Sequence, residues 1–171
     1  MKVAAAQCAS KPGDIVANVR RHVAVVERAA PLEADAVVFP ELSLIGYEPR
    51  FAAATATAPE DPRFAPLQAA SERCGILVAV GAPLETPDLP RIATQIFRPF
   101  APIVVHVKRL LHGDEVPWFA REQRLTIVMS SAVGPFADGM AGGRSAAWRP
   151  DGTLAASLGA TGDGLVCSDT R

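Results

Sequence analysis

The sequence has few cysteines, no long apolar run and no excess of charge of either sign. The three cysteines, Cys8, Cys74 and Cys167, are far apart and form no CxxC pair, which argues against a disulfide framework and against a zinc site. No apolar segment approaches the ~20 residues that span a bilayer, and the first residues become polar too early for a signal peptide. We therefore expect a cytoplasmic protein with free thiols and no membrane partner.

Charge and composition exclude further classes of protein. The 17 Lys and Arg residues nearly balance the 18 Asp and Glu residues, so no nucleic-acid partner is expected. Hydrophobic residues make up 49% of the 171 positions, which is enough for a sizeable core and excludes wholesale disorder. The three histidines are scattered, and the glycine-rich stretch 139–145 lacks the spacing and the lysine of a phosphate-binding loop. We expect one domain that holds no metal and no cofactor.

The hydrophobic pattern predicts an α/β protein. A short buried strand at 2–7 precedes a helix that begins behind Asp14 and shows one apolar stripe at steps of three or four residues. A second buried strand at 36–39 follows, which suggests a βαβ-like start. A further helix should end at Gly75. Strands are then expected at 76–81, 92–97, 103–108, 125–131, 146–149, 153–158 and 165–168, with a hairpin turn at 150–152.

Glu41 is the first candidate for chemistry. It follows the strand at 36–39 in the segment 39–47, FPELSLIGY, where open sheets present catalytic groups. Pro40 stiffens the approach, and Gly46 lets the loop turn back. A lone glutamate in a loop is usually a solvated carboxylate. Its position alone therefore favours a solvated side chain over a general base.

Lys108 and Glu115 form the second candidate. Lys108 ends a predicted strand, and Glu115 follows seven residues later. A lysine beside carboxylates can stabilise a developing oxyanion as a fixed positive charge. Taken alone, a lysine at a strand end is more often an ordinary surface residue.

Together the two segments resemble a known family. Residues 39–47 look like the glutamate motif of the nitrilase family of carbon–nitrogen hydrolases, and 108–111 followed by Asp114 and Glu115 resemble its lysine motif. The flanking features occur in the family's order. They are residues 3–7, 13–14, Asn18, 75–81, 128–134, 142–145 and 150–152.

The resemblance implies a fold and a mechanism. The fold would be a four-layer αββα sandwich, incomplete here, formed by residues 1–171 as one domain. The chemistry would be hydrolysis of a small amide or nitrile, in which a cysteine thiolate attacks the carbon. Glu41 would be the base, Lys108 would stabilise the oxyanion, and Glu115 would be the second carboxylate that orients the site.

One part of the family pattern is missing. The nucleophile belongs on a strand after the lysine motif, in a hydrophobic-Cys-aromatic-Asp context, yet the chain has no cysteine between Cys74 and Cys167. The sequence passes directly from 118–120 into a stretch that resembles a much later strand. We expect the lost segment at 120–121. Cys8, Cys74 and Cys167 are better explained as packed thiols than as substitutes.

Three functions remain open at this point. The chain could be an amide or nitrile hydrolase whose cysteine segment is absent from the given sequence. It could be a catalytically inactive scaffold or interaction module, and loss of a core strand would leave apolar surface that favours a homo-oligomer. It could also bind a small amide or carboxylate at Glu41 and Lys108 without turnover.

Overall fold

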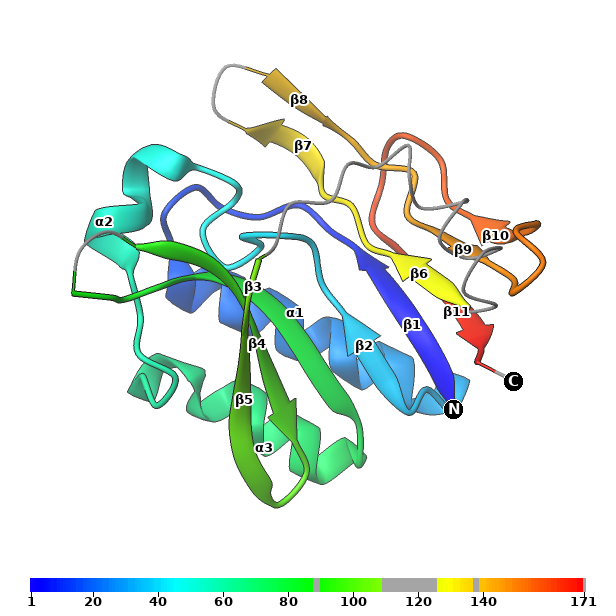
Figure 1. The fold of residues 1–171 in the computed structure, drawn as a ribbon, viewed down its shortest axis with the longest axis horizontal. Coiled ribbons are helices and arrows are strands. Elements are labelled where there is room, and N and C mark those ends of the chain that lie inside the picture. Colours follow the sequence, from blue (N-terminus) through cyan, green and yellow to red (C-terminus); the bar gives the residue numbers. More distant parts are fainter. Residues whose placement is uncertain (88–89, 109–125, 137–138, 171) are drawn as a thin grey trace.

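The computed structural model describes residues 1–87, 90–108, 126–136 and 139–170. These residues form an α/β fold whose main element is a six-stranded sheet in the order β11-β1-β2-β3-β4-β5 (Figure 1). Its strands are β1 (Lys2–Gln7), β2 (Ala36–Val38), β3 (Leu77–Leu84), β4 (Arg91–Arg98), β5 (Ala101–Val107) and β11 (Gly164–Asp169). β1, β2 and β3 run parallel, and the other pairs are antiparallel.

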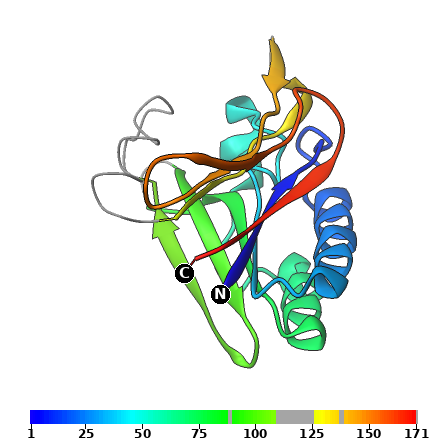
Figure 2. The same ribbon diagram turned by 90° about the vertical axis from the view of Figure 1, so that its right-hand side faces the viewer.

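Helices cover one face of this sheet (Figure 2). The longest are α1 (Ile15–Ala29) and α3 (Ala65–Cys74). Asp14 caps α1 as predicted, because its carboxylate accepts a hydrogen bond from the backbone N–H of Ala17 at 3.0 Å. Gly75 ends α3 in the left-handed conformation with φ 68°, also as predicted. The short elements between the strands are η1 (Ala30–Leu32), η2 (Pro49–Phe51), α2 (Ala52–Thr55) and η3 (Pro62–Phe64).

A second, three-stranded sheet packs on the opposite face. It has the order β10-β9-β6, with β6 (Ile127–Met129), β9 (Ala146–Trp148) and β10 (Leu154–Ser157). Ala4 and Ala6 of β1 pack with the helices, whereas Ala5 packs with Ala147 of β9. This alternation along one strand follows from the two-residue period of side chains in a β-strand. The described residues thus form three layers: one of helices and two of β-sheet. The second helical layer of the expected αββα sandwich is not found among the described residues.

The predicted hairpin after β9 is confirmed. β9 and β10 pair antiparallel, and the turn between them contains Gly152 with φ 84°. The backbone N–H of Gly152 donates to the carbonyl of Arg149 at 2.8 Å. Proline at the start of the turn and glycine at its end suit this geometry.

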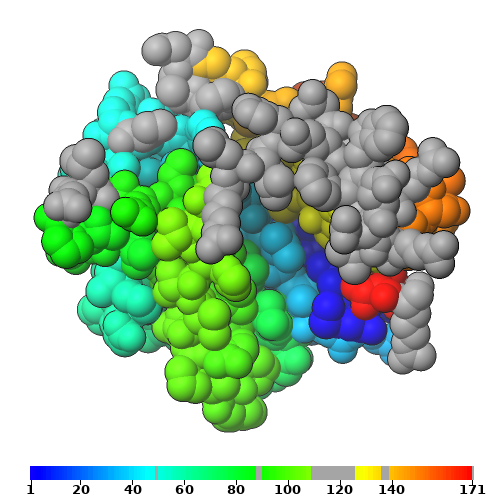
Figure 3. Space-filling model, viewed as in Figure 1, coloured from blue at the N-terminus to red at the C-terminus, as the bar shows by residue number. Residues whose placement is uncertain are grey.

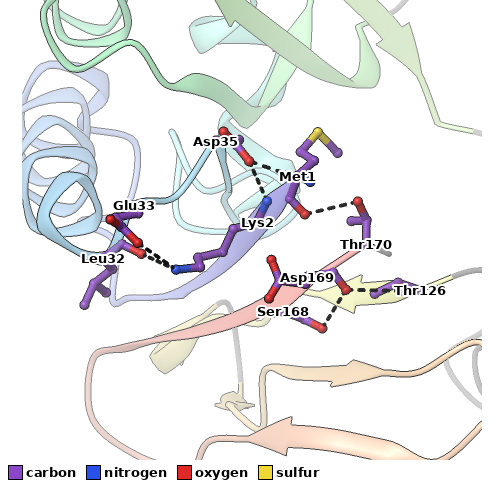
Figure 4. A network of polar contacts seen from close by, with 9 residues as sticks. All are labelled: Met1, Lys2, Leu32, Glu33, Asp35, Thr126, Ser168, Asp169 and Thr170. Atoms are coloured by element: carbon purple, nitrogen blue, oxygen red, sulfur yellow. Dashed lines mark hydrogen bonds and ion pairs between the residues drawn. The ribbon is translucent and has the colours of Figure 1, made fainter.

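A polar network ties the start of β1 to its two neighbours (Figure 4). The backbone N–H of Lys2 donates to Asp35 at 2.6 Å, and the Lys2 ammonium donates to the carbonyl of Leu32 at 2.9 Å. On the other side, the hydroxyl of Thr170 donates to the carbonyl of Met1 at 3.1 Å. These contacts fix the end of the parallel strands that lies away from Glu41.

Two expectations need correction. β3 continues to Leu84 instead of ending at Gly81, because residues 82–84 pair with the first strand residues of β4. A two-stranded hairpin of β7 (Val133–Phe136) and β8 (Gly139–Gly142) occurs where no strands were predicted. Its glycines and Pro135 give no alternating apolar pattern.

Candidate active site

Glu41 lies just past the end of β2, in a loop held against β3. The N–H of Phe39 donates to the carbonyl of Ala79 at 2.8 Å, and the N–H of Leu44 donates to the carbonyl of Gly81 at 3.0 Å. The loop therefore continues the hydrogen bonding of the parallel sheet beyond β2 and then turns. Side chains in such a loop are presented at the carboxyl edge of the sheet, as the sequence predicted.

Gly81 makes this close approach possible. A Cβ atom at position 81 would lie 2.2 Å from the backbone nitrogen of Leu42, 2.6 Å from the carbonyl oxygen of Pro40 and 2.8 Å from the carbonyl carbon of Glu41. All three neighbours are backbone atoms, which cannot move aside as a flexible side chain can. The absence of a side chain at position 81 thus sets where the Glu41 loop lies.

Side chains of helix α1 form hydrogen bonds with the loop that carries Glu41. Asn18 is fully buried, and its amide donates to the carbonyl of Leu44 at 2.9 Å and to that of Lys11 at 2.8 Å. One helical turn later, Nε2 of His22 lies 2.8 Å from the hydroxyl of Ser43. The His22 ring also stacks on Phe39 with a centroid separation of 4.0 Å. Two polar side chains on one face of α1 therefore fix the loop that carries Glu41.

His22 is held in its neutral form. Burial lowers the pKa of its imidazole to about 3, because no counter-charge compensates the lost hydration of the cation. The backbone of Asn18 opposes this lowering of the pKa only in part. In its neutral form this histidine positions the Ser43 loop.

Lys108 meets Glu41 directly. It follows the last residue of β5, where its N–H donates to the carbonyl of Ile92 at 2.9 Å. Its ammonium nitrogen lies 2.5 Å from Oε2 of Glu41. The side chain of Lys108 is 37% exposed and that of Glu41 is 32% exposed, so the pair lies near the surface. The fold thus brings together two motifs that are far apart in the sequence.

Glu41 borders a cavity. Pro40, Glu41 and Tyr47 line one side of a space of about 270 Å³, and residues 130–132 with Ala141 and Gly142 line the other. Oε1 of Glu41 is buried and accepts no hydrogen bond from the described residues. Lys108 instead lines a neighbouring hollow of about 360 Å³ with Arg91, Ile92 and Val107. Glu41 therefore holds Lys108 with one oxygen, and its other oxygen has no hydrogen-bond donor among the described residues.

The opposite wall was missed by sequence reasoning. Ser130 follows β6, and its hydroxyl donates to the carbonyl of Ala6 in β1. The N–H of Ser131 donates to the hydroxyl of Ser145 at 2.9 Å, and the N–H of Ser145 donates to the buried amide oxygen of Gln7 at 3.0 Å. Segments 128–134 and 142–145 carried a family resemblance, but nothing in them predicted these long-range contacts.

Two predicted features lie outside the described residues. They are Glu115 and the expected seam at 120–121. Glu115 therefore stays a prediction as the orienting carboxylate. The contact of Glu41 with Lys108 is observed, but their roles as base and oxyanion stabiliser also stay predictions.

None of the three cysteines, all of which the structure describes, lines the cavity beside Glu41. Cys8 is 2% exposed, and burial, reinforced by the negative charge of Asp163, raises the pKa of its thiol to about 12. Burial also raises the pKa of Cys167 on β11, and Cys74 packs against the core from α3. A thiol with such a raised pKa is almost wholly protonated at neutral pH and is a poor nucleophile.

No helix in the described part of the chain is both long enough and apolar enough to cross a bilayer. No cluster of three or more histidine, cysteine, aspartate or glutamate side chains within the described ranges is placed to bind a metal ion.

Solved amidase structures share the fold. An amidase from Nesterenkonia sp. AN1 is 18% identical and superposes with a TM-score of 0.85 over 100% of this chain and 93% of that chain. A double mutant of the amidase from the same organism, in complex with acrylamide, is also 18% identical. It superposes with a TM-score of 0.85 over 100% of this chain and 90% of that chain. A further mutant carries the acetamide moiety of fluoroacetamide bound covalently at its active-site cysteine. It is 18% identical and superposes with a TM-score of 0.83 over 98% of this chain and 89% of that chain.

Sequence comparison identifies the family. No match to this chain is found among curated proteins. The family model for carbon-nitrogen hydrolases matches residues 2–98, which is more than half of the 171 residues and includes the Glu41 loop. The length of the chain also fits the loss of an internal segment. The chain belongs to the carbon–nitrogen hydrolase family.

Proposed function

We propose that this chain carries the acid–base part of a hydrolase site for small amides or nitriles, and that it binds such molecules without hydrolysing them. Glu41 is the base and Lys108 the stabiliser of the oxyanion in this proposal. The thiolate that would complete the Glu-Lys-Cys mechanism is missing. The fold neighbours support the ligand class, because one was solved with acrylamide and another with an acetamide group on its cysteine.

The unpartnered oxygen of Glu41 carries the proposal. A buried carboxylate oxygen without a hydrogen bond costs free energy unless a ligand or solvent donates to it. An amide N–H is a suitable donor to a carboxylate oxygen, and the other oxygen of Glu41 is already paired with the ammonium of Lys108. A cavity of about 270 Å³ is slightly smaller than the roughly 300–1,000 Å³ of drug-sized ligand sites, which suits a molecule of a few heavy atoms.

Hydrolysis would need a nucleophile that this chain does not supply. In the family's reaction the glutamate takes the proton of the cysteine thiol, and the thiolate attacks the amide carbon. The proton passes to the amide nitrogen as the C–N bond breaks and ammonia leaves. Water then hydrolyses the thioester to the acid and the free thiol. With a pKa of about 12, only about one Cys8 thiol in 10⁵ is ionised at pH 7. Ser130 and Ser131 line the cavity, but their hydroxyls are not paired with a base among the described residues.

Replacing Lys108 separates binding from stability. We expect Lys108→Met to change the free energy of unfolding by less than about 1 kcal/mol, because the pair is about one-third exposed. The same change should weaken binding of propionamide by about fivefold, because the Glu41 carboxylate loses the ammonium group that holds it in place beside the cavity. Urea denaturation measures the first quantity, and a titration followed by NMR chemical shifts measures the second.

Arg91→Met is the matched control. It removes a cation from the hollow that Lys108 lines without touching the contact between Lys108 and Glu41. Propionamide should bind this variant as it binds the unmodified chain. Equal weakening by both substitutions, or none by Lys108→Met, would show that binding does not depend on the Lys108–Glu41 pair.

Residues 1–171 form one domain with an internal deletion at 120–121 in this proposal. A measured mass of 17.9 kDa for the intact protein would support a true deletion, whereas a larger mass would reveal the missing segment.

We also propose that the chain self-associates. β5 is the edge strand of the main sheet, and the β4–β5 hairpin faces the viewer at the surface in Figure 3, with Phe100 83% exposed at its turn.

A further inference from the structure

The β7–β8 hairpin forms one wall of the cavity beside Glu41. It projects beyond the two larger sheets at the top of Figures 1 and 2. β7 and β8 pair antiparallel, with Val133 opposite Gly142 and Gly134 opposite Ala141. Ala141 and Gly142 line the cavity across from Pro40, Glu41 and Tyr47. Ala141 and Gly142 therefore contribute little side-chain volume to the lining of the cavity.

Gly142 is a glycine for which neither backbone nor packing gives a reason. Its φ angle is not in the left-handed region, and a Cβ atom built at this position would meet no atom within 4 Å. The next residue is different, because Gly143 has φ 56° and its Cβ would lie 2.6 Å from the carbonyl oxygen of Ala160. Gly143 is thus required by the turn, whereas the space at Gly142 is open and borders the cavity.

We infer that Gly142 determines the size of ligand that the cavity accepts. This inference rests on the proposed binding of small amides at Glu41. The amide group must stay near Glu41 to donate its hydrogen bond, so the rest of the ligand extends along the other lining residues, Gly142 among them. A side chain at position 142 would occupy that space and exclude the longer acyl groups first.

Substitutions at position 142 should leave the fold intact. Gly142 is exposed at the end of β8, and glycine in a strand loses more backbone entropy on folding than any other residue. The Cβ of alanine or leucine thus meets no atom within 4 Å, and either residue lowers that entropic cost. Unfolding curves for the variants should match or exceed that of the unmodified chain.

An amide series tests the inference. Acetamide, propionamide and butyramide are titrated into the unmodified chain, Gly142→Ala and Gly142→Leu, with NMR chemical shifts giving each dissociation constant. We expect Gly142→Leu to weaken butyramide binding at least tenfold while acetamide changes by less than twofold, with Gly142→Ala in between. Gly159→Ala is the matched control, because its Cβ also enters open space and Gly159 does not line the cavity.

The outcomes separate the two proposals. If the unmodified chain binds none of the three amides, the proposed function fails and the inference about Gly142 fails with it. If the unmodified chain binds them and Gly142→Leu weakens all three equally or none of them, only the size-limiting role of Gly142 is overturned. A loss of butyramide binding in Gly159→Ala as well would also contradict that role.

Discussion

Gly81→Ala should destabilise the protein by about 3 kcal/mol or more and abolish amide binding. The added Cβ would lie within 2.2–2.8 Å of three backbone atoms of the loop that carries Glu41, distances that a folded chain does not tolerate. Either the loop separates from β3 and loses the hydrogen bond from Leu44 to Gly81, or β3 shifts within the core. Overpacking of this kind costs roughly 1–3 kcal/mol, and the lost backbone hydrogen bond adds to that cost.

Gly159→Ala separates this effect from the general effect of removing a glycine. Its Cβ would meet nothing within 4 Å, so its unfolding midpoint should stay close to that of the unmodified chain. Urea denaturation gives the difference in free energy, and a propionamide titration reports whether Glu41 still meets the ligand. A Gly81→Ala protein as stable as Gly159→Ala, with unchanged affinity, would refute the close approach of loop and strand.

Lowering the pH from 7 to 4 should cost the protein on the order of 3 kcal/mol of stability through His22 alone. The folded state keeps this imidazole neutral with a pKa of about 3, against the ordinary histidine pKa of 6.5. Between these values the unfolded chain binds a proton that the folded chain does not. The contribution of His22 is therefore fully present above pH 6.5 and is lost as the pH falls toward 3.

His22→Gln removes the titrating group and should flatten this part of the stability profile. Carboxylates also respond to acid, so the informative quantity is the difference between the two profiles from pH 7 to pH 4. His106→Gln is the control, because His106 is exposed on β5 and its replacement should leave the slope unchanged. Parallel profiles for His22→Gln and the unmodified chain would mean that His22 is not buried in its neutral form.

The sequence predicted most of the framework for local reasons. The stripe behind Asp14, the stop at Gly75 and the turn at 150–152 depend on neighbours within a few residues, and each appears as expected. Glu41 and Lys108 were paired through their family motifs, and the fold brings them into contact. No periodicity in the chain would have joined them, because their meeting depends on the order of strands in the sheet.

The rest of the cavity depends on contacts that have no local signal. The β7–β8 hairpin is rich in glycine and lacks alternation, so a loop was the natural interpretation. Gln7 and Ser145 are 138 residues apart in the sequence and are joined by a hydrogen bond in the fold, and neither residue type predicts such a partner. His22 was one of three scattered histidines until the structure placed it against Ser43.

Saturation-transfer NMR with propionamide tests the central claim most directly, because one sample reports both binding and turnover over time. Saturation should pass from the unmodified chain to the propionamide protons, and no propionate signal should grow beyond that of a protein-free sample. Absence of saturation transfer would contradict binding at Glu41. Growth of propionate that stops in Glu41→Gln would contradict the claim that this chain lacks a nucleophile for the site.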